Sequence, residues 1–182
     1  MALTKVTGAG VGTLDSATIT SATISNQLTD VNMSTGSVLQ VVHSSSGTNV
    51  ALANDISTFA DAHQASITPR ATSSKIVVLG SVSGDVTNGN YRAMRYRIMR
   101  AISGGATTDI YQRNYHMYGG NAAGTHNIDN TELFVLDSPS TTSELTYKIQ
   151  GAHQTGSSQS GTYNGYLNRY SLSTLILMEI AG

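Results

Sequence analysis

Residues 91–102 read Tyr91-Arg92-Ala93-Met94-Arg95-Tyr96-Arg97-Ile98-Met99-Arg100-Ala101-Ile102. Successive side chains of a β-strand point to opposite faces of its sheet. In an extended chain, one face of this segment carries apolar side chains, namely Met94, Tyr96, Ile98 and Ile102. The opposite face carries Arg95 and Arg97. Gly89 and Gly104 flank the segment, and its twelve residues suit a long strand better than a helix.

Short segments rich in β-branched and aromatic residues recur along the chain, separated by turn-forming residues. This spacing is typical of an antiparallel sandwich or barrel. We treat residues 51–65 as a loop, although they are the only plausible short helix. Residues 175–180 are almost continuously apolar, so we expect cover on both faces, from the opposing sheet and from a neighbouring subunit. The other predicted strands are Ser37–His43, Lys75–Val82, Asp109–Tyr118, Leu133–Leu136, Leu145–Ala152 and Leu172–Ile180.

The composition supports an ordered all-β protein. Ser and Thr make up about a quarter of the chain, and only 12% of residues are charged. Disorder usually combines few apolar residues with a high net charge, but here 39% are apolar and the net charge is −1. A net charge so close to zero argues against nucleic acid as the main partner. The apolar runs are also too short to enter a membrane.

The chain divides near residue 36 into two predicted parts. Residues 1–36 form a short extended N-terminal arm, and residues 37–182 form a jelly-roll-like β-sandwich domain. The arm repeats five residues, Ser16–Thr20 and Ser21–Ser25, almost unchanged. Its apolar residues are too few for one chain to bury alone, although three chains wound about a common axis can bury them. A flexible leader is the other interpretation of the same pattern.

Three phrases of the domain resemble a known family: Gly36–Val42, Ile67–Val78 and Ser173–Ile180. In that order they are similar to the trimeric, tumour-necrosis-factor-like jelly rolls at the ends of bacteriophage fibres and in other virion proteins. The opening residues, Met1–Thr7, also resemble the start of many phage tail fibre and tailspike chains. The resemblance covers nearly the whole domain but contains no catalytic motif.

This resemblance implies a homotrimer in an extracellular virion, a short tail fibre or fibre tip that contacts the host surface. It also implies that the arm binds other virion proteins. The residues expected to anchor the arm to the particle are Leu3, Val6, Leu14, Ile19 and Ile24. The alternative is a trimeric capsid decoration protein that stabilises the shell, because a long fibre would have an adaptor and a shaft.

Arginines and tyrosines are the candidate contact residues. Arg92, Arg95, Arg97 and Arg100 form the densest group of positive charge. Guanidinium groups bind carboxylates and phosphates through paired hydrogen bonds, so Arg95 and Arg97 are candidate contacts for a host glycan. Pairing with carboxylates across a subunit interface is the other interpretation, and we favour it. Tyr163 and Tyr166 are further candidate contacts for a host glycan, because tyrosine rings bind both sugars and protein surfaces.

The sequence contains no pattern that predicts catalysis or a cofactor. Cysteine is absent, which excludes disulfides and thiolate metal ligands. The five histidines form no HxH or HExxH pair, although a three-fold axis can gather one from each subunit. No G-x-S-x-G elbow occurs. We therefore expect no enzyme activity, no metal and no cofactor.

Overall fold

The computed structural model describes residues 33–53, 57–87, 92–117, 126–154 and 164–182. Within these residues the chain forms ten β-strands and no helix, as the sequence predicted. No segment among them is a helix long and apolar enough to span a membrane. The strands are β1 (Val38–Ser46), β2 (Val50–Ala51), β3 (Ala60–Ile67), β4 (Lys75–Thr87), β5 (Arg92–Ile102), β6 (Thr107–Met117), β7 (His126–Asp137), β8 (Leu145–Gln154), β9 (Asn164–Leu167) and β10 (Ser173–Ile180).

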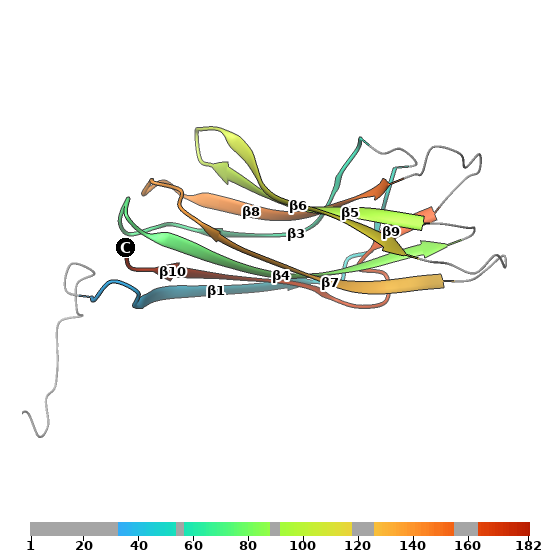
Figure 1. Cartoon of the computed structure of the whole chain (residues 1–182), viewed down its shortest axis with the longest axis horizontal. Coiled ribbons are helices and arrows are strands. Elements are labelled where there is room, and N and C mark those ends of the chain that lie inside the picture. The colour runs from blue at the N-terminus through green and yellow to red at the C-terminus, as the bar shows by residue number, and fades with distance from the viewer. Residues whose placement is uncertain (1–32, 54–56, 88–91, 118–125, 155–163) are drawn as a thin grey trace, which may run out of the picture.

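Two antiparallel sheets stack face to face as an elongated, jelly-roll-like sandwich (Figure 1). The six-stranded sheet has the order β1-β10-β4-β9-β2, and β7 pairs with the other side of β4. The four-stranded sheet has the order β3-β8-β5-β6. We call the face of each sheet that meets the other sheet its inner face, and the opposite face its outer face.

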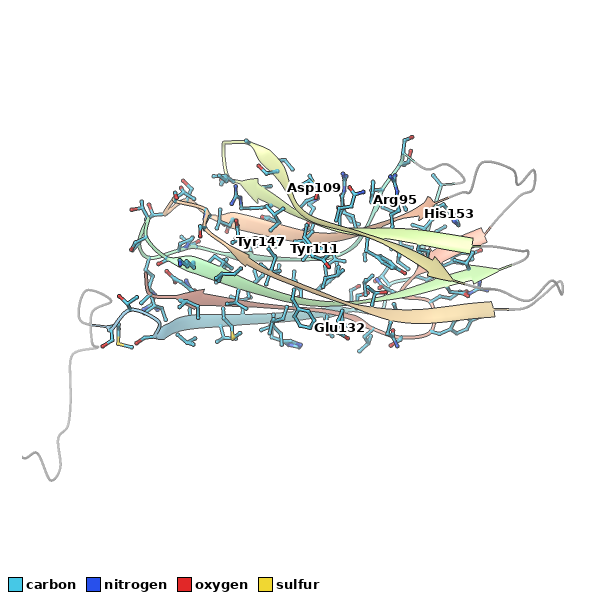
Figure 2. The ribbon with its side chains drawn as sticks, viewed as in Figure 1. Arg95, Asp109, Tyr111, Glu132, Tyr147 and His153 are labelled. Atoms are coloured by element: carbon cyan, nitrogen blue, oxygen red, sulfur yellow. The ribbon has the colours of Figure 1, made fainter. Side chains whose placement is uncertain are left out.

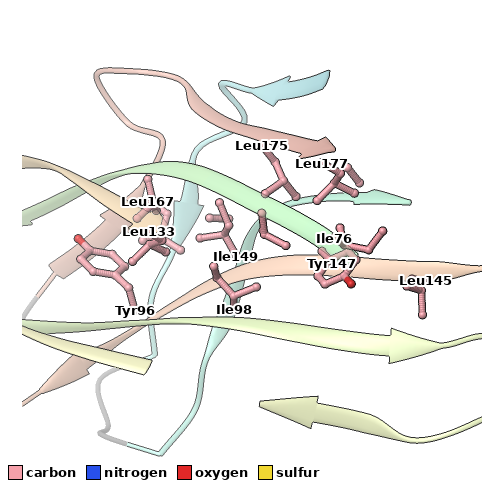
Figure 3. Close-up of a cluster of buried hydrophobic side chains, with 14 of the residues drawn as sticks. Ile76, Tyr96, Ile98, Leu133, Leu145, Tyr147, Ile149, Leu167, Leu175 and Leu177 are labelled. Atoms are coloured by element: carbon pink, nitrogen blue, oxygen red, sulfur yellow. The ribbon is translucent and has the colours of Figure 1, made fainter. Parts of the chain in front are cut away.

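Apolar side chains from both inner faces fill the space between the sheets (Figure 3). The alternation in β10 shows how this arises, because Leu175 and Leu177 are fully buried whereas Ile176 and Met178 remain half-buried on the outer face. Burying one such leucine contributes about 1.5–3 kcal/mol. The largest fully buried apolar side chains are Tyr96, Tyr147, Ile76, Met94, Ile98, Leu133, Leu145, Ile149, Leu167, Leu175 and Leu177.

Close packing explains a glycine inside the long strand β4. A Cβ atom on Gly84 would lie 2.7 Å from Sδ of Met94 and closer still to the hydroxyl oxygen of Tyr96. The buried Tyr96 ring of the four-stranded sheet therefore needs a residue without a side chain opposite it. This glycine lets the two sheets approach without displacing the aromatic core.

The strand predictions are confirmed for β1, β5, β6, β8 and β10, with small differences at their ends, and for β4, which continues beyond the predicted Val82 to Thr87. The interpretation of residues 51–65 as a loop was wrong, because β2 and β3 occupy part of this segment. Pairing with β8 holds β3 extended although its sequence, ADAHQASI, is not typical of a strand. The strand predicted at residues 133–136 is also longer, since β7 pairs with β4 over residues 126–137.

Both ends of the domain lie together at one end of the sandwich (Figure 1). The backbone N–H of Gly36 donates to the carbonyl of Ala181 over 2.8 Å, and Ala181 N–H donates to the carbonyl of Ser37. Residues 1–32 lie outside the described residues, so the proposed arm and its anchoring residues remain predictions. The same is true of the division into arm and domain.

One polar cluster links the two sheets inside the sandwich. Nη1 of Arg100 donates to both carboxylate oxygens of Asp137, at 2.7 and 2.8 Å, and the Tyr147 hydroxyl donates to Oδ2 over 2.7 Å. Burial raises the pKa of Tyr147, and the neighbouring Asp137 raises it further, so the phenol stays protonated and donates. Asp137 belongs to β7, whereas its two partners belong to β5 and β8.

Replacing Asp137 should destabilise the fold strongly. Asp137→Ala leaves the largely buried Arg100 guanidinium and the Tyr147 hydroxyl without their acceptor, which should lower the free energy of unfolding by ~3–5 kcal/mol. Urea denaturation measures this loss. The matched variant Asp61→Ala removes an exposed carboxylate and should cost under ~1 kcal/mol. Equal losses in the two variants would contradict this structural role.

Candidate interaction surfaces

Arg95 and Arg97 lie on the outer face of the four-stranded sheet, as the alternation in β5 predicted. The ring of Phe59, just before β3, lies beneath both guanidinium groups. Its centroid is 5.0 Å from Cζ of Arg95 and 3.9 Å from Cζ of Arg97. Such cation–π contacts hold an arginine side chain against the face of an aromatic ring. We call Phe59, Arg95 and Arg97 the arginine–phenylalanine site.

Polar side chains continue this site across the outer face of the sheet. Nε of Arg97 donates to Oε1 of Gln150 over 2.7 Å, and its Nη1 lies 3.7 Å from Oδ2 of Asp109. Asp61 accepts hydrogen bonds from Gln150 and from Nζ of Lys148. Partial burial opposes ionisation of Asp61, but these hydrogen bonds and the neighbouring cations lower its pKa. Exposed pairs of this kind contribute ~0–1 kcal/mol each, so their main effect is to orient Arg97.

The four arginines predicted as one cluster are separated in the fold. Arg95 and Arg97 share the outer face, but Arg100 points inward to Asp137. The Arg92 side chain lies outside the described part of the structure. Our favoured interpretation, pairing with carboxylates of another subunit, does not match Arg97 and Arg100, because each has a carboxylate partner in its own chain.

Tyr166 and the arginine–phenylalanine site belong to different sheets. Tyr166 lies in β9 of the six-stranded sheet, with Cζ of Arg169 4.3 Å from its ring centroid. Arg169 also lies 5.3 Å from the Tyr170 ring and 3.3 Å from Oδ2 of the buried Asp85. Tyr163 falls outside the described residues. Among the described residues, Tyr166 therefore does not share a site with Arg95 and Arg97 in this chain.

The outer face of the six-stranded sheet is mainly apolar. Strand register aligns two rows of outward side chains across β1, β10, β4 and β7. The first row is Val41, Met178, Val77 and Leu136, and the second is His43, Ile176, Leu79 and Phe134. We call the seven apolar residues of these rows the apolar face. Figure 2 shows Glu132, which neighbours this face on β7, on the opposite side of the molecule from Arg95 and Asp109.

Two histidines meet where β1 of one sheet lies beside β3 of the other. His43 is exposed at the end of its apolar row, whereas His63 is partly buried. Burial lowers the pKa of His63; a hydrogen bond to the Ser44 backbone raises it, and the charge of His43 lowers it again. The net direction is downward, so the folded state favours neutral His63. Within the described residues, no group of three metal-ligating side chains comes together.

Acidification should weaken the fold through His63. An unfolded histidine has a pKa near 6.5 and the folded one is lower, so the unfolded state binds more protons as the pH falls. This stability is complete above about pH 6.5 and is lost as the pH falls toward the folded pKa. Urea midpoints at pH 7.5, 6.5 and 5.5 should therefore decrease, and His63→Gln should reduce the decrease. His43→Gln removes only the neighbouring charge and should keep most of it. Identical pH slopes in wild type and His63→Gln would refute this assignment.

Comparison with known proteins gives only distant structural similarities. No family model matches the chain, and no curated protein matches it. One similar solved structure is that of the infectious bursal disease virus Gx strain, with 13% identity and a TM-score of 0.42 over 80% of this chain. A VP2 subviral particle of the same virus has 16% identity and a TM-score of 0.41 over 78%. This chain covers 33% and 37% of those chains, respectively. TM-scores near 0.4 at such identities do not establish a common fold.

Proposed function

We propose that this chain is a structural protein of a bacteriophage virion, a homotrimeric short tail fibre or fibre tip. Its arm, residues 1–36, attaches to other virion proteins, and its sandwich domain contacts the host surface. The observation that carries this proposal is the difference between the two outer faces. One face is apolar and suits permanent contact with protein, while the other is polar and suits reversible contact with a ligand.

The sequence resemblance supports this role, and the described all-β sandwich is compatible with it. The phrases that resemble phage fibre jelly rolls lie in β1, at the β3–β4 junction and in β10. These elements are neighbours in the sandwich, because β1 pairs with β10 and β10 pairs with β4. The resemblance therefore involves adjoining parts of one fold rather than scattered turns.

The arginine–phenylalanine site is the proposed contact with the host. Two guanidinium groups over one ring offer N–H donors to a carboxylate or phosphate, and the ring supports the apolar side of a sugar. Acidic glycans of a cell surface have this chemistry. Lys148 of β8, which also pairs with Asp61, adds a cation on the same outer face.

The alternative role is a trimeric decoration protein of the capsid. One observation favours it: Arg97 already has Gln150 and Asp109 as partners in its own chain, so its position has a structural explanation. A decoration protein would still need the arm and the apolar face. It would not need the arginine–phenylalanine site to bind a glycan.

Deletion of residues 1–36 should abolish incorporation into particles without unfolding the domain. The strands begin at Val38, so the truncated chain keeps every described strand. Quantitative mass spectrometry of purified virions measures incorporation, and circular dichroism checks the fold. Copy number separates the two roles, since a fibre is present in few copies and a decoration protein covers the shell. Normal incorporation of the truncated chain would refute the anchoring role.

Replacing Arg95 and Arg97 together by Gln should weaken attachment to host cells. Losing two charge-assisted contacts should reduce binding of the purified protein by about tenfold or more. The control is Lys75→Gln, which removes an exposed cation from the other sheet. Unchanged cell binding with normal incorporation would reject the host-contact site and leave the decoration role.

A further inference from the structure

The apolar face gathers apolar side chains on the outer side of the six-stranded sheet. Its side chains at the two edges are largely exposed: Val41 is 57% exposed, Leu136 57% and Phe134 58%. Between them, the side chains from β10 and β4 are half-buried. A contiguous apolar patch of a few hundred Å² on a protein surface is often a binding surface.

Exposed large apolar side chains are confined to one sheet. Six such residues occur in the described part of the chain, and all belong to strands or connections of the six-stranded sheet. They are Val38, Val41, Phe134, Leu136, Tyr170 and Leu172. The outer face of the four-stranded sheet instead presents Asp61, Lys148, Gln150 and the two outward arginines. Exposed apolar surface that a protein partner could bury is therefore found on the six-stranded side of the sandwich.

We infer that copies of this chain pack on one another through the apolar face. This inference rests on the homotrimer in the proposed function and names the surface that forms it. The two rows contain no acidic residue, lysine or arginine, and His43 is their only titratable residue. Identical faces can thus meet without strong repulsion between like charges, which is a requirement for contact between copies.

The positions of the exposed residues suit a closed ring. Val41 lies on β1 at one edge of the face, and Phe134 and Leu136 lie on β7 at the other edge. If the outer faces of the six-stranded sheets point to a common three-fold axis, β7 of one chain lies next to β1 of the following chain. In a ring each chain uses both edges, so no exposed edge is left over.

The size of the apolar face suits the centre of such an interface. Strands lie ~4.8 Å apart and every second residue ~6.6 Å apart, so eight positions cover roughly 250 Å² of the sheet. A stable contact buries about 800 Å² per partner, with an apolar centre and a polar rim. Polar residues suitable for the rim lie in the neighbouring rows. Lys75 is paired with Ile180 at one end of the apolar face, and Glu132 is paired with Ser81 at the other end.

Cysteine cross-linking tests which faces meet. The chain has no cysteine of its own. In Val41→Cys/Leu136→Cys the two thiols are three strand spacings, ~14 Å, apart within one chain, too far for an internal disulfide. Oxidation should therefore give covalent dimers and trimers that a reducing agent separates. Failure to cross-link a trimeric protein would contradict the inference.

The opposite sheet provides a matched control. Gln64 and Asp109 also share one row across four strands, through Lys148 and Met99. Gln64→Cys/Asp109→Cys has the same spacing on the outer face of the four-stranded sheet. It should remain monomeric on a non-reducing gel at equal protein concentration. Equal cross-linking of both variants would show random collision and would overturn the assignment of the face.

A second variant measures the energetic contribution of the face. Phe134→Thr/Leu136→Thr keeps strand-forming residues but removes the largest exposed apolar groups, and should weaken self-association by about two orders of magnitude. Sedimentation equilibrium measures the mass, and thermal denaturation checks the fold. If the wild type and the variant are both trimers of equal stability, the apolar face is not the interface, but the proposed homotrimer is still supported. A monomeric wild type would overturn both and assign the face to another particle protein.

Discussion

Strand β4 pairs with three other strands along its thirteen residues, with β7 on one side and with β10 and then β9 on the other. This central position fixes the environment of each of its faces. Val78 and Val82 point inward and are fully buried, whereas Val77 and Leu79 point outward. Because the first half of β4 is apolar on both sides, the sheet built around it has an apolar outer face.

The opposite sheet has a different outer face because of β5 and β8. Buried apolar residues alternate with polar residues over 94–98 in β5 and over 145–150 in β8, and the register of these strands places Arg97 beside Gln150. The polar residues interact with one another and with Phe59. The sandwich therefore has two sides of different chemistry. Strand β4 has apolar side chains on both of its faces, whereas β5 and β8 have them mainly on the inner face.

The sequence allowed correct prediction of elements whose pattern is internal to the strand. Strand β5 has a clear period of two, and β10 has a continuous apolar run. Strands β3 and β9 could not be predicted in this way, because their pairing partners, not their own residues, hold them extended. Phe59 was missed for a similar reason, since its place under Arg95 and Arg97 depends on β8 lying between β3 and β5. The position of Arg100 was predictable, because a period of two puts it on the same face as Ile98.

The position of the chain ends connects the two proposed contacts. Residues 36 and 37 are hydrogen-bonded to Ala181 at one end of the sandwich, so the proposed arm would join the domain beside β1 and β10. Both strands belong to the sheet with the apolar face. A ring of copies joined through that face would bring its arms out at the same end, close to the common axis. The four-stranded sheets would then face away from the axis, which leaves the arginine–phenylalanine sites accessible at the outside of the assembly. Attachment at one end and ligand contact on the outside are thus compatible in a single assembly, and neither requires a change in the fold.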